Sequence, residues 1–299
     1  MKSIVLMDGG MGQELIARSS LPTTSLWSAQ VMMNEPEIVE AVHRAYIDSG
    51  AKVLTLNSYS ATPERLARDA SEDLFEPLQA KAISIAKDAI GDRDVQMAGC
   101  LPPLFGSYHP EHAPEYERCL LTYRRLVECQ KGDVDIFLTE TLASVKEIAA
   151  AVTAAHESGI PVWCGMTVDD NDGTKLRSGE SVEEGIEAAA KAGAVAVGIN
   201  CSRPEAVAQA VPAMKNSGLA FGGWANGFTN AAEDLAVGGI VDGMRKRVDL
   251  GPDAYADHVM AWVDAGATLV GGCCEVGPAH IETLQKRLTA AGFEITGQL

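Results

Sequence analysis

The chain has 299 residues, of which 46% are hydrophobic, enough for one large domain or two small ones with a sizeable core. Its formal net charge is −17 and its pI is about 4.7, which argues against nucleic acid and anionic membranes as partners. No apolar run reaches the roughly 20 residues of a membrane span, and residues 4–7 are too few for the apolar core of a signal peptide. Seven cysteines without a secretory signal predict reduced thiols and a cytoplasmic location.

Eight short apolar runs, taken in chain order, predict the strands. Each run is continuously apolar, as is typical of strands that are buried on both faces of a parallel sheet. Seven of them follow a helix-like stretch that ends in glycine, a residue that readily adopts the left-handed conformation at helix C-termini. The predicted strands are 4–7, 53–56, 95–98, 136–138, 162–164, 195–197, 219–221 and 269–270.

Capping residues predict where several helices begin. Thr62 precedes Pro63, and proline is favoured in the first turn of a helix. Ser144, Ser181 and Ser202 are each followed three residues later by glutamate, which is the pattern of a reciprocal capping box. The segments 17–34 and 102–118, rich in proline, serine and small residues, predict long loops at the rim of the fold.

This alternation of strands and helices predicts an α/β fold, a single (β/α)8 TIM barrel over residues 1–299. The alternative is an open doubly wound sheet, which usually has a glycine-rich phosphate loop after its first strand. Residues 8–13 resemble such a loop superficially, but they lack the G-x-G-x-x-G spacing and Asp8 would repel a pyrophosphate. We therefore expect the barrel.

The carboxyl ends of the strands meet at one face of such a barrel, so the residues that follow each strand indicate the chemistry of the site. Most of these positions carry polar or metal-binding side chains, which are costly to bury unless they are paired or used. In chain order they are Asp8, 57–59, 99–100, Glu140, 166–167, Cys201, Asn226 and 273–274.

Three cysteines predict a zinc site at this face. Zn²⁺ prefers tetrahedral sulfur or nitrogen ligands, and a catalytic site keeps one position open. Cys201 comes just before the predicted helix cap Ser202, where a helix N-terminus stabilises a thiolate. Cys273 and Cys274 follow two glycines that let both sulfurs face one ion, although a redox pair would have the same spacing. The other four cysteines, at 100, 119, 129 and 164, are interpreted as small buried hydrophobes.

With these residues in place, the chain resembles the homocysteine S-methyltransferase family. The similarity runs in family order over nearly the whole chain, and the two cysteine motifs are its most specific part. The resemblance implies a (β/α)8 barrel in which Cys201, Cys273 and Cys274 bind zinc, with no organic cofactor. The matching segments are 8–12 (DGGMG), 26–29 (LWSA), 57–63 (NSYSATP), 139–141 (TET), 198–201 (GINC), 271–274 (GGCC) and 278–281 (PAHI).

The same resemblance implies a reaction and roles for five further residues. The thiol of homocysteine would enter the open zinc position, lose its proton and attack a methyl group on a cationic donor, giving methionine. Asp8 and Glu140, the candidate catalytic residues, would also bind the homocysteine ammonium; otherwise they are a turn residue and a helix-start carboxylate. Trp27 and Tyr59 are candidates for the donor pocket because aromatic faces attract onium cations, although both could simply pack in the core. Asn226 could hydrogen-bond the substrate.

The donor is expected to be S-methylmethionine or a related sulfonium such as S-adenosylmethionine. Betaine-using members of the family carry an aromatic residue directly after the glutamate. This chain has Thr141 there, which weakens an aromatic cage for a quaternary ammonium, and a betaine-type enzyme is therefore only the alternative. Two other classes remain open: a barrel enzyme that uses Asp8 and Glu140 as acid and base, and a non-catalytic zinc- or thiol-binding protein. In every case the expected partners are small molecules, and the sequence does not indicate the oligomeric state.

Overall fold

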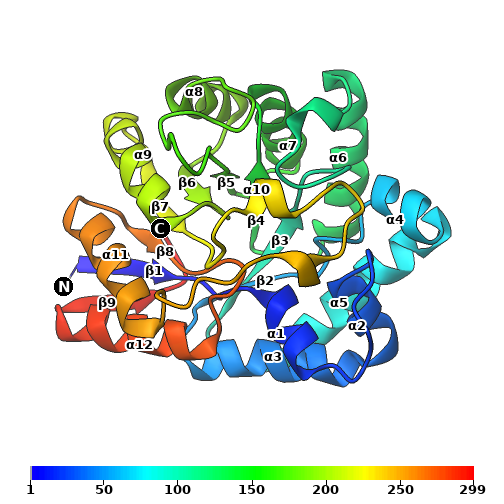
Figure 1. Cartoon of the computed structure of the whole chain (residues 1–299), viewed down its shortest axis with the longest axis horizontal. Coiled ribbons are helices and arrows are strands. Elements are labelled where there is room, and N and C mark those ends of the chain that lie inside the picture. Colours follow the sequence, from blue (N-terminus) through cyan, green and yellow to red (C-terminus); the bar gives the residue numbers. More distant parts are fainter. Residues whose placement is uncertain (1) are drawn as a thin grey trace.

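The computed structural model describes residues 2–299, apart from the side chain of residue 242, and shows parallel strands ringed by helices (Figure 1). Each hydrogen-bonded pair of strands is parallel, in the order β2-β3-β4-β5-β6-β7-β8-β1-β9. The strands are β1 (Lys2–Leu6), β2 (Val53–Thr55), β3 (Gln96–Leu101), β4 (Ile136–Leu142), β5 (Val162–Met166), β6 (Ala196–Asn200), β7 (Ala220–Trp224), β8 (Leu269–Val270) and β9 (Phe293–Thr296).

The sheet closes into a barrel where the end of β1 meets β2. Met7 forms a parallel bridge with Val53, the amide of Lys52 donates to Leu6 O at 2.8 Å, and the amide of Asp8 donates to Val53 O at 3.0 Å. The eight predicted strands and the (β/α)8 architecture are therefore confirmed. The ninth strand, β9, was not predicted; it pairs with β1 over Lys2 to Val5.

Helices cover the outside of the barrel. Within the described chain, none of them is long and apolar enough to cross a membrane. Segment 17–34, predicted as a loop, contains α2, so that expectation was wrong in part. The helices are α1 (Met11–Arg18), α2 (Ser28–Asn34), α3 (Pro36–Asp48), α4 (Pro63–Asp69), α5 (Phe75–Ile90), α6 (Tyr116–Gln130), α7 (Val145–His156), α8 (Val182–Ala192), α9 (Pro204–Asn216), α10 (Ala231–Asp234), α11 (Pro252–Asp264) and α12 (Pro278–Ala290).

Three of the four predicted caps are confirmed. The side chain of Thr62 accepts from the amide of Arg65, that of Ser144 from Glu147, and Ser181 forms the complete capping box with Glu184. The prediction for Ser202 was wrong, because α9 begins one residue later than that cap requires. The Ser202 hydroxyl instead bonds the amide of Val168 at 2.9 Å, so it ties the end of β6 to the loop after β5.

The barrel interior is apolar and is closed near the site by one large ring. Alternate strand residues fill this interior. At the carboxyl ends of the strands the indole of Trp224, the last residue of β7, lies across β6. A Cβ on Gly198 would come within 2.2 Å of that indole, so glycine is required for the close approach. Trp224 is 1% exposed and also lines the cavity described below, which makes it the floor of the site.

A buried histidine in α3 generates a prediction for the pH dependence of stability. His43 is 0% exposed, and neither ring nitrogen has a hydrogen-bond partner among the described residues. Burial lowers the pKa of His43 to about 3, from an ordinary 6.5, so the folded state holds the ring neutral where the unfolded state takes up a proton.

The substitution His43→Leu should therefore stabilise the protein increasingly as the pH falls. Protonation of His43 in the unfolded state lowers the unfolding free energy of the parent below pH 6.5, and the variant lacks this contribution. The difference in unfolding free energy should therefore grow by about 2 kcal/mol between pH 7 and pH 5. Urea unfolding of both proteins at several pH values measures this difference, and other titrating groups cancel between them. A difference that does not change with pH would contradict the buried, neutral histidine.

Candidate active site

A cavity of about 1170 Å³, its open mouth included, lies at the carboxyl ends of the strands. The segment between β7 and α11, which holds α10, crosses over these strand ends and supplies part of the lining (Figure 1). Seven of the eight residues singled out in the sequence line this cavity: Asp8, Trp27, Tyr59, Glu140, Cys201, Cys273 and Cys274.

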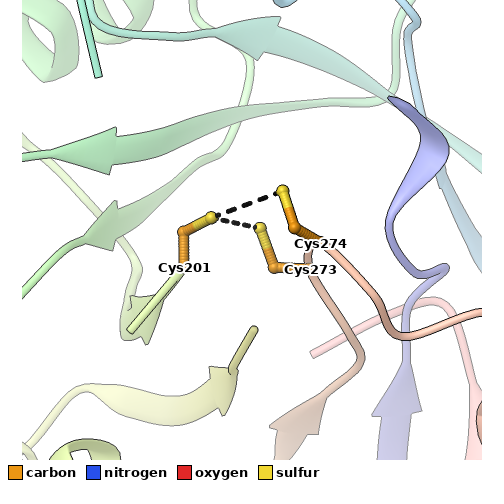
Figure 2. Close-up of side chains that lie close together, drawn as sticks. All are labelled: Cys201, Cys273 and Cys274. Atoms are coloured by element: carbon orange, nitrogen blue, oxygen red, sulfur yellow. Dashed lines mark hydrogen bonds between the residues drawn. The ribbon is translucent and has the colours of Figure 1, made fainter. Parts of the chain in front are cut away.

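The three predicted ligand cysteines meet at the cavity although 72 residues separate the first from the second. Figure 2 shows their side chains pointing toward one another from the ends of β6 and β8. Their sulfur atoms all lie within 4.8 Å of one another. The Sγ of Cys201 is 2.8 Å from that of Cys273 and 3.9 Å from that of Cys274.

This cluster fits a tetrahedral metal ion after a small adjustment. Ligand sulfurs at 2.3 Å from a zinc ion are about 3.8 Å apart, close to the separation of Cys201 and Cys274. Cys273 is closer than that to Cys201, so its sulfur would have to move by roughly 1 Å to become a ligand. Among the described residues, no other group of three histidine, cysteine or acidic side chains is arranged to hold a metal.

The surroundings of Cys201 favour its thiolate. Burial raises the pKa of this thiol, but hydrogen bonds from Cys273, Cys274 and Tyr108 outweigh burial and hold the pKa well below its usual range. The sequence had attributed this effect to a helix cap at Ser202. Because α9 begins only at Pro204, neighbouring donors replace the cap as the cause.

Tyr108 is a site residue that the sequence analysis missed. It lies in segment 102–118, and its hydroxyl is 3.0 Å from the Sγ of Cys201. The guanidinium of Arg177 stacks on the Tyr108 ring at 4.8 Å and forms a buried ion pair with Asp170 at 3.1 Å. A single aromatic residue in an irregular loop carries no periodic signal, so only the folded arrangement identifies it.

Asp8, which is buried, and Glu140, which is partly exposed, place two carboxyl groups in the cavity wall. The Asp8 carboxylate accepts from the amide of Thr55 at 2.8 Å and from its hydroxyl at 3.1 Å. Burial, opposed by these bonds and reinforced by Glu140, raises the pKa of Asp8 to about 8. Burial also raises the pKa of Glu140 to about 7, even though the Cys100 thiol donates to it at 3.1 Å.

Trp27 and Tyr59 form an aromatic corner of the cavity. Their ring centroids are 5.9 Å apart and the planes are nearly perpendicular. A Cβ on Gly12 would come within 2.1 Å of the Trp27 ring, so Gly12 makes room for it. The guanidinium of Arg65 lies over the Tyr59 ring at 5.1 Å, which leaves Trp27 the more open of the two surfaces.

Asn226 is the one predicted site residue that does not line the cavity. It is 0% exposed, and its Oδ1 accepts from the amide of Phe228 at 3.2 Å. Its Nδ2 has no partner among the described residues. In this arrangement Asn226 shapes the turn after β7.

Comparison with known proteins assigns the family. The sequence profile of the homocysteine S-methyltransferase family matches residues 5–288. Homocysteine S-methyltransferase 4 of Zea mays is 27% identical over 97% of this chain and 90% of its own length, and selenocysteine Se-methyltransferase of Brassica oleracea var. italica is 28% identical over 95% and 89%. The metallated form of the homocysteine methyltransferase MmuM from Escherichia coli superposes with a TM-score of 0.77 at 26% identity, covering 96% of both chains. The chain belongs to the homocysteine S-methyltransferase family.

Proposed function

We propose that this protein transfers a methyl group from a sulfonium donor, such as S-methylmethionine, to the thiol of homocysteine, using a zinc ion held by Cys201, Cys273 and Cys274. The observation that carries the proposal is the convergence of three thiols in the wall of a cavity that is also lined by two carboxyl groups. Membership of the family supports the reaction class.

A zinc ion held by these three cysteines would supply an open position for a fourth thiol and would favour the thiolate form of that thiol. The protein's part is to hold its own three sulfurs in place. The amide of Cys201 donates to Trp224 O at 3.1 Å and the amide of Cys273 donates to Ala225 O at 2.9 Å, so β7 fixes both loops relative to each other. This anchoring limits the reorganisation that metal binding requires.

Asp8 and Glu140 are proposed to hold the ammonium group of homocysteine. Burial raises the pKa of both acids, so the cavity wall disfavours their charged forms. An ammonium between them would offset that penalty, so binding and ionisation support each other. Asp8 is fixed by Thr55 and Glu140 by Cys100, which positions the amino acid for attack by its sulfur.

Trp27 and Tyr59 are proposed to face the donor. A betaine-type pocket is disfavoured because the position after Glu140 holds Thr141, whose side chain offers no aromatic face to a quaternary ammonium. Thr141 is also buried, and its amide donates to Oδ1 of Asn200 at 2.7 Å. The candidate residues come from both halves of the chain, so we propose that the whole barrel is one functional domain. A reducing compartment such as the cytoplasm would keep the three thiols available for metal.

A methyl-transfer assay tests the proposal. The zinc-loaded protein should produce methionine from homocysteine with a sulfonium donor, and Cys201→Ser should lose both bound zinc and activity because a ligand is gone. Cys129→Ser is the matched control, since Cys129 lies on α6 outside the cluster. Activity that survives in the Cys201 variant would favour a zinc-independent acid–base enzyme. Zinc and homocysteine binding without turnover on a panel of sulfonium and ammonium donors would indicate a binding protein.

The hydroxyl of Tyr108 generates a second prediction. Tyr108→Phe removes the hydrogen bond to Cys201 and should weaken zinc binding about tenfold, as loss of a partner behind a metal ligand typically does. Competition with a chelator measures the zinc affinity. Tyr116→Phe, at the start of α6, is the control and should bind zinc like the parent. Equal affinities of all three proteins would show that Tyr108 only packs against the cluster.

The two carboxyl groups predict how product binding depends on pH. Methionine lacks a thiol, so its affinity reports the ammonium site without titration of homocysteine sulfur. Because carboxylates form as the pH rises through about 7 for Glu140 and about 8 for Asp8, methionine should bind at least about tenfold more tightly at pH 8 than at pH 6.

Calorimetry at a series of pH values measures this change. Asp8→Asn and Glu140→Gln should each weaken binding at pH 8 and flatten the profile, because each removes one of the two titrating groups. A parent affinity that is constant or falls over this range would exclude these carboxyl groups as the ammonium site.

A further inference from the structure

Arg65 brings a positive charge to the aromatic corner of the cavity. It lies in the first turn of α4, where its amide is bonded to the Thr62 cap. Its guanidinium stacks on the Tyr59 ring at 5.1 Å and lines the cavity. The Ser107 hydroxyl connects the two residues, since it lies 3.2 Å from Nη2 of Arg65 and 2.8 Å from the Tyr59 hydroxyl.

The hydrogen bonds of Arg65 all go to neutral oxygens. Nε and Nη2 donate to Pro103 O at 3.2 and 3.1 Å, and Nη2 also reaches Ser107. Among the described side chains, no carboxylate lies within 4.0 Å of its nitrogens, and no hydrogen bond of Nη1 is found in residues 2–299. The guanidinium is therefore held in place, without an ion pair to any side chain that the structure describes.

Arg68, one turn further along α4, shows the contrast. It lines the same cavity, but its Nε and Nη2 bind the carboxylate of Asp69 at 2.8 and 2.6 Å. Its Nη1 donates to Phe105 O at 2.7 Å. Arg68 is thus neutralised within the protein, and Asp69, which lies one turn after Arg65 on α4, is already paired with it.

A partly buried guanidinium without a counter-ion is unfavourable unless a ligand supplies the anion. Its planar fork matches a carboxylate better than any other small anionic group except phosphate. We propose that Arg65 binds the carboxylate of the methyl donor, so that the enzyme selects sulfonium donors that are also carboxylic acids. This inference rests on the proposed function, in which the ammonium of homocysteine lies at Asp8 and Glu140 and the donor lies at Trp27 and Tyr59.

The same charge also acts against the wrong donor. A sulfonium compound without a carboxylate would place its cation near the Arg65 guanidinium with nothing to offset the repulsion. With a carboxylate, the ligand pairs its anion with Arg65 and leaves its sulfonium for the face of Trp27 and the acidic side of the cavity. Arg65 would therefore determine donor specificity without touching the reacting atoms.

Equilibrium binding to the zinc-loaded protein tests this assignment independently of turnover. The probes are S-methylmethionine and its carboxamide, which differ in the carboxylate alone. The parent should bind the carboxylate at least tenfold more tightly by calorimetry. Arg65→Gln should bind both ligands within about twofold of each other, because the amide keeps a hydrogen-bond donor but not the charge.

Two further variants make the test specific. Arg125→Gln removes a guanidinium that stacks on the Phe75 ring outside this cavity and should keep the full preference of the parent. Arg65→Lys keeps the charge without the fork and should lose at least threefold of the preference. It answers the same question if Arg65→Gln unfolds in a thermal melt.

The proposal is overturned if the parent does not distinguish the two probes, if the Arg65 variants keep the full preference, or if they weaken homocysteine binding in place of donor binding. Failure of the proposed function is a separate result. In that case the parent would make no methionine with any donor, while the binding preference and its loss in Arg65→Gln would still be measured.

Discussion

The parallel closure of the barrel is the constraint on which the site depends. It turns the carboxyl ends of all strands to one face, so Cys201 after β6 and the pair 273–274 after β8 become neighbours. Strand β7 lies between them, and Trp224 at its end and Ala225 just after it accept amide hydrogen bonds from the two loops. Neither loop could hold a metal ion alone, because no tetrahedral site forms from one or two thiols without further ligands.

Around this cluster lie several ionisable side chains in surroundings that disfavour their charged forms. Asp8 and Glu140 have raised pKa values because burial removes water from them, and no carboxylate among the described side chains lies within 4.0 Å of the Arg65 guanidinium nitrogens. A zwitterionic amino-acid substrate brings the complementary groups. Two amino-acid-like ligands would therefore supply the charges that pair these groups. Ligands without the complementary charges would leave the groups unpaired and would bind more weakly.

Patterns of short range were enough to predict the strands, most helix caps and the three cysteines. Apolar runs and glycine-ended helices gave the correct eight strands because burial on both faces leaves a strong local signal. The cap at Ser202 was wrong because its hydroxyl bonds the loop after β5, a contact between distant segments. The same reason hid Tyr108 and the ninth strand, whose positions depend on partners far away in the sequence. Asn226 was placed at the correct strand end, but whether its side chain faces the cavity depends on the turn that it caps.

Zinc K-edge X-ray absorption of the metal-loaded protein, with and without homocysteine, tests the central claim most directly. Three converging thiols and one open position predict a spectrum of three sulfur ligands and one lighter ligand for the protein alone. Addition of homocysteine should change it to four sulfurs at about 2.3 Å. A site with fewer than three sulfurs, or one that homocysteine leaves unchanged, would contradict the account.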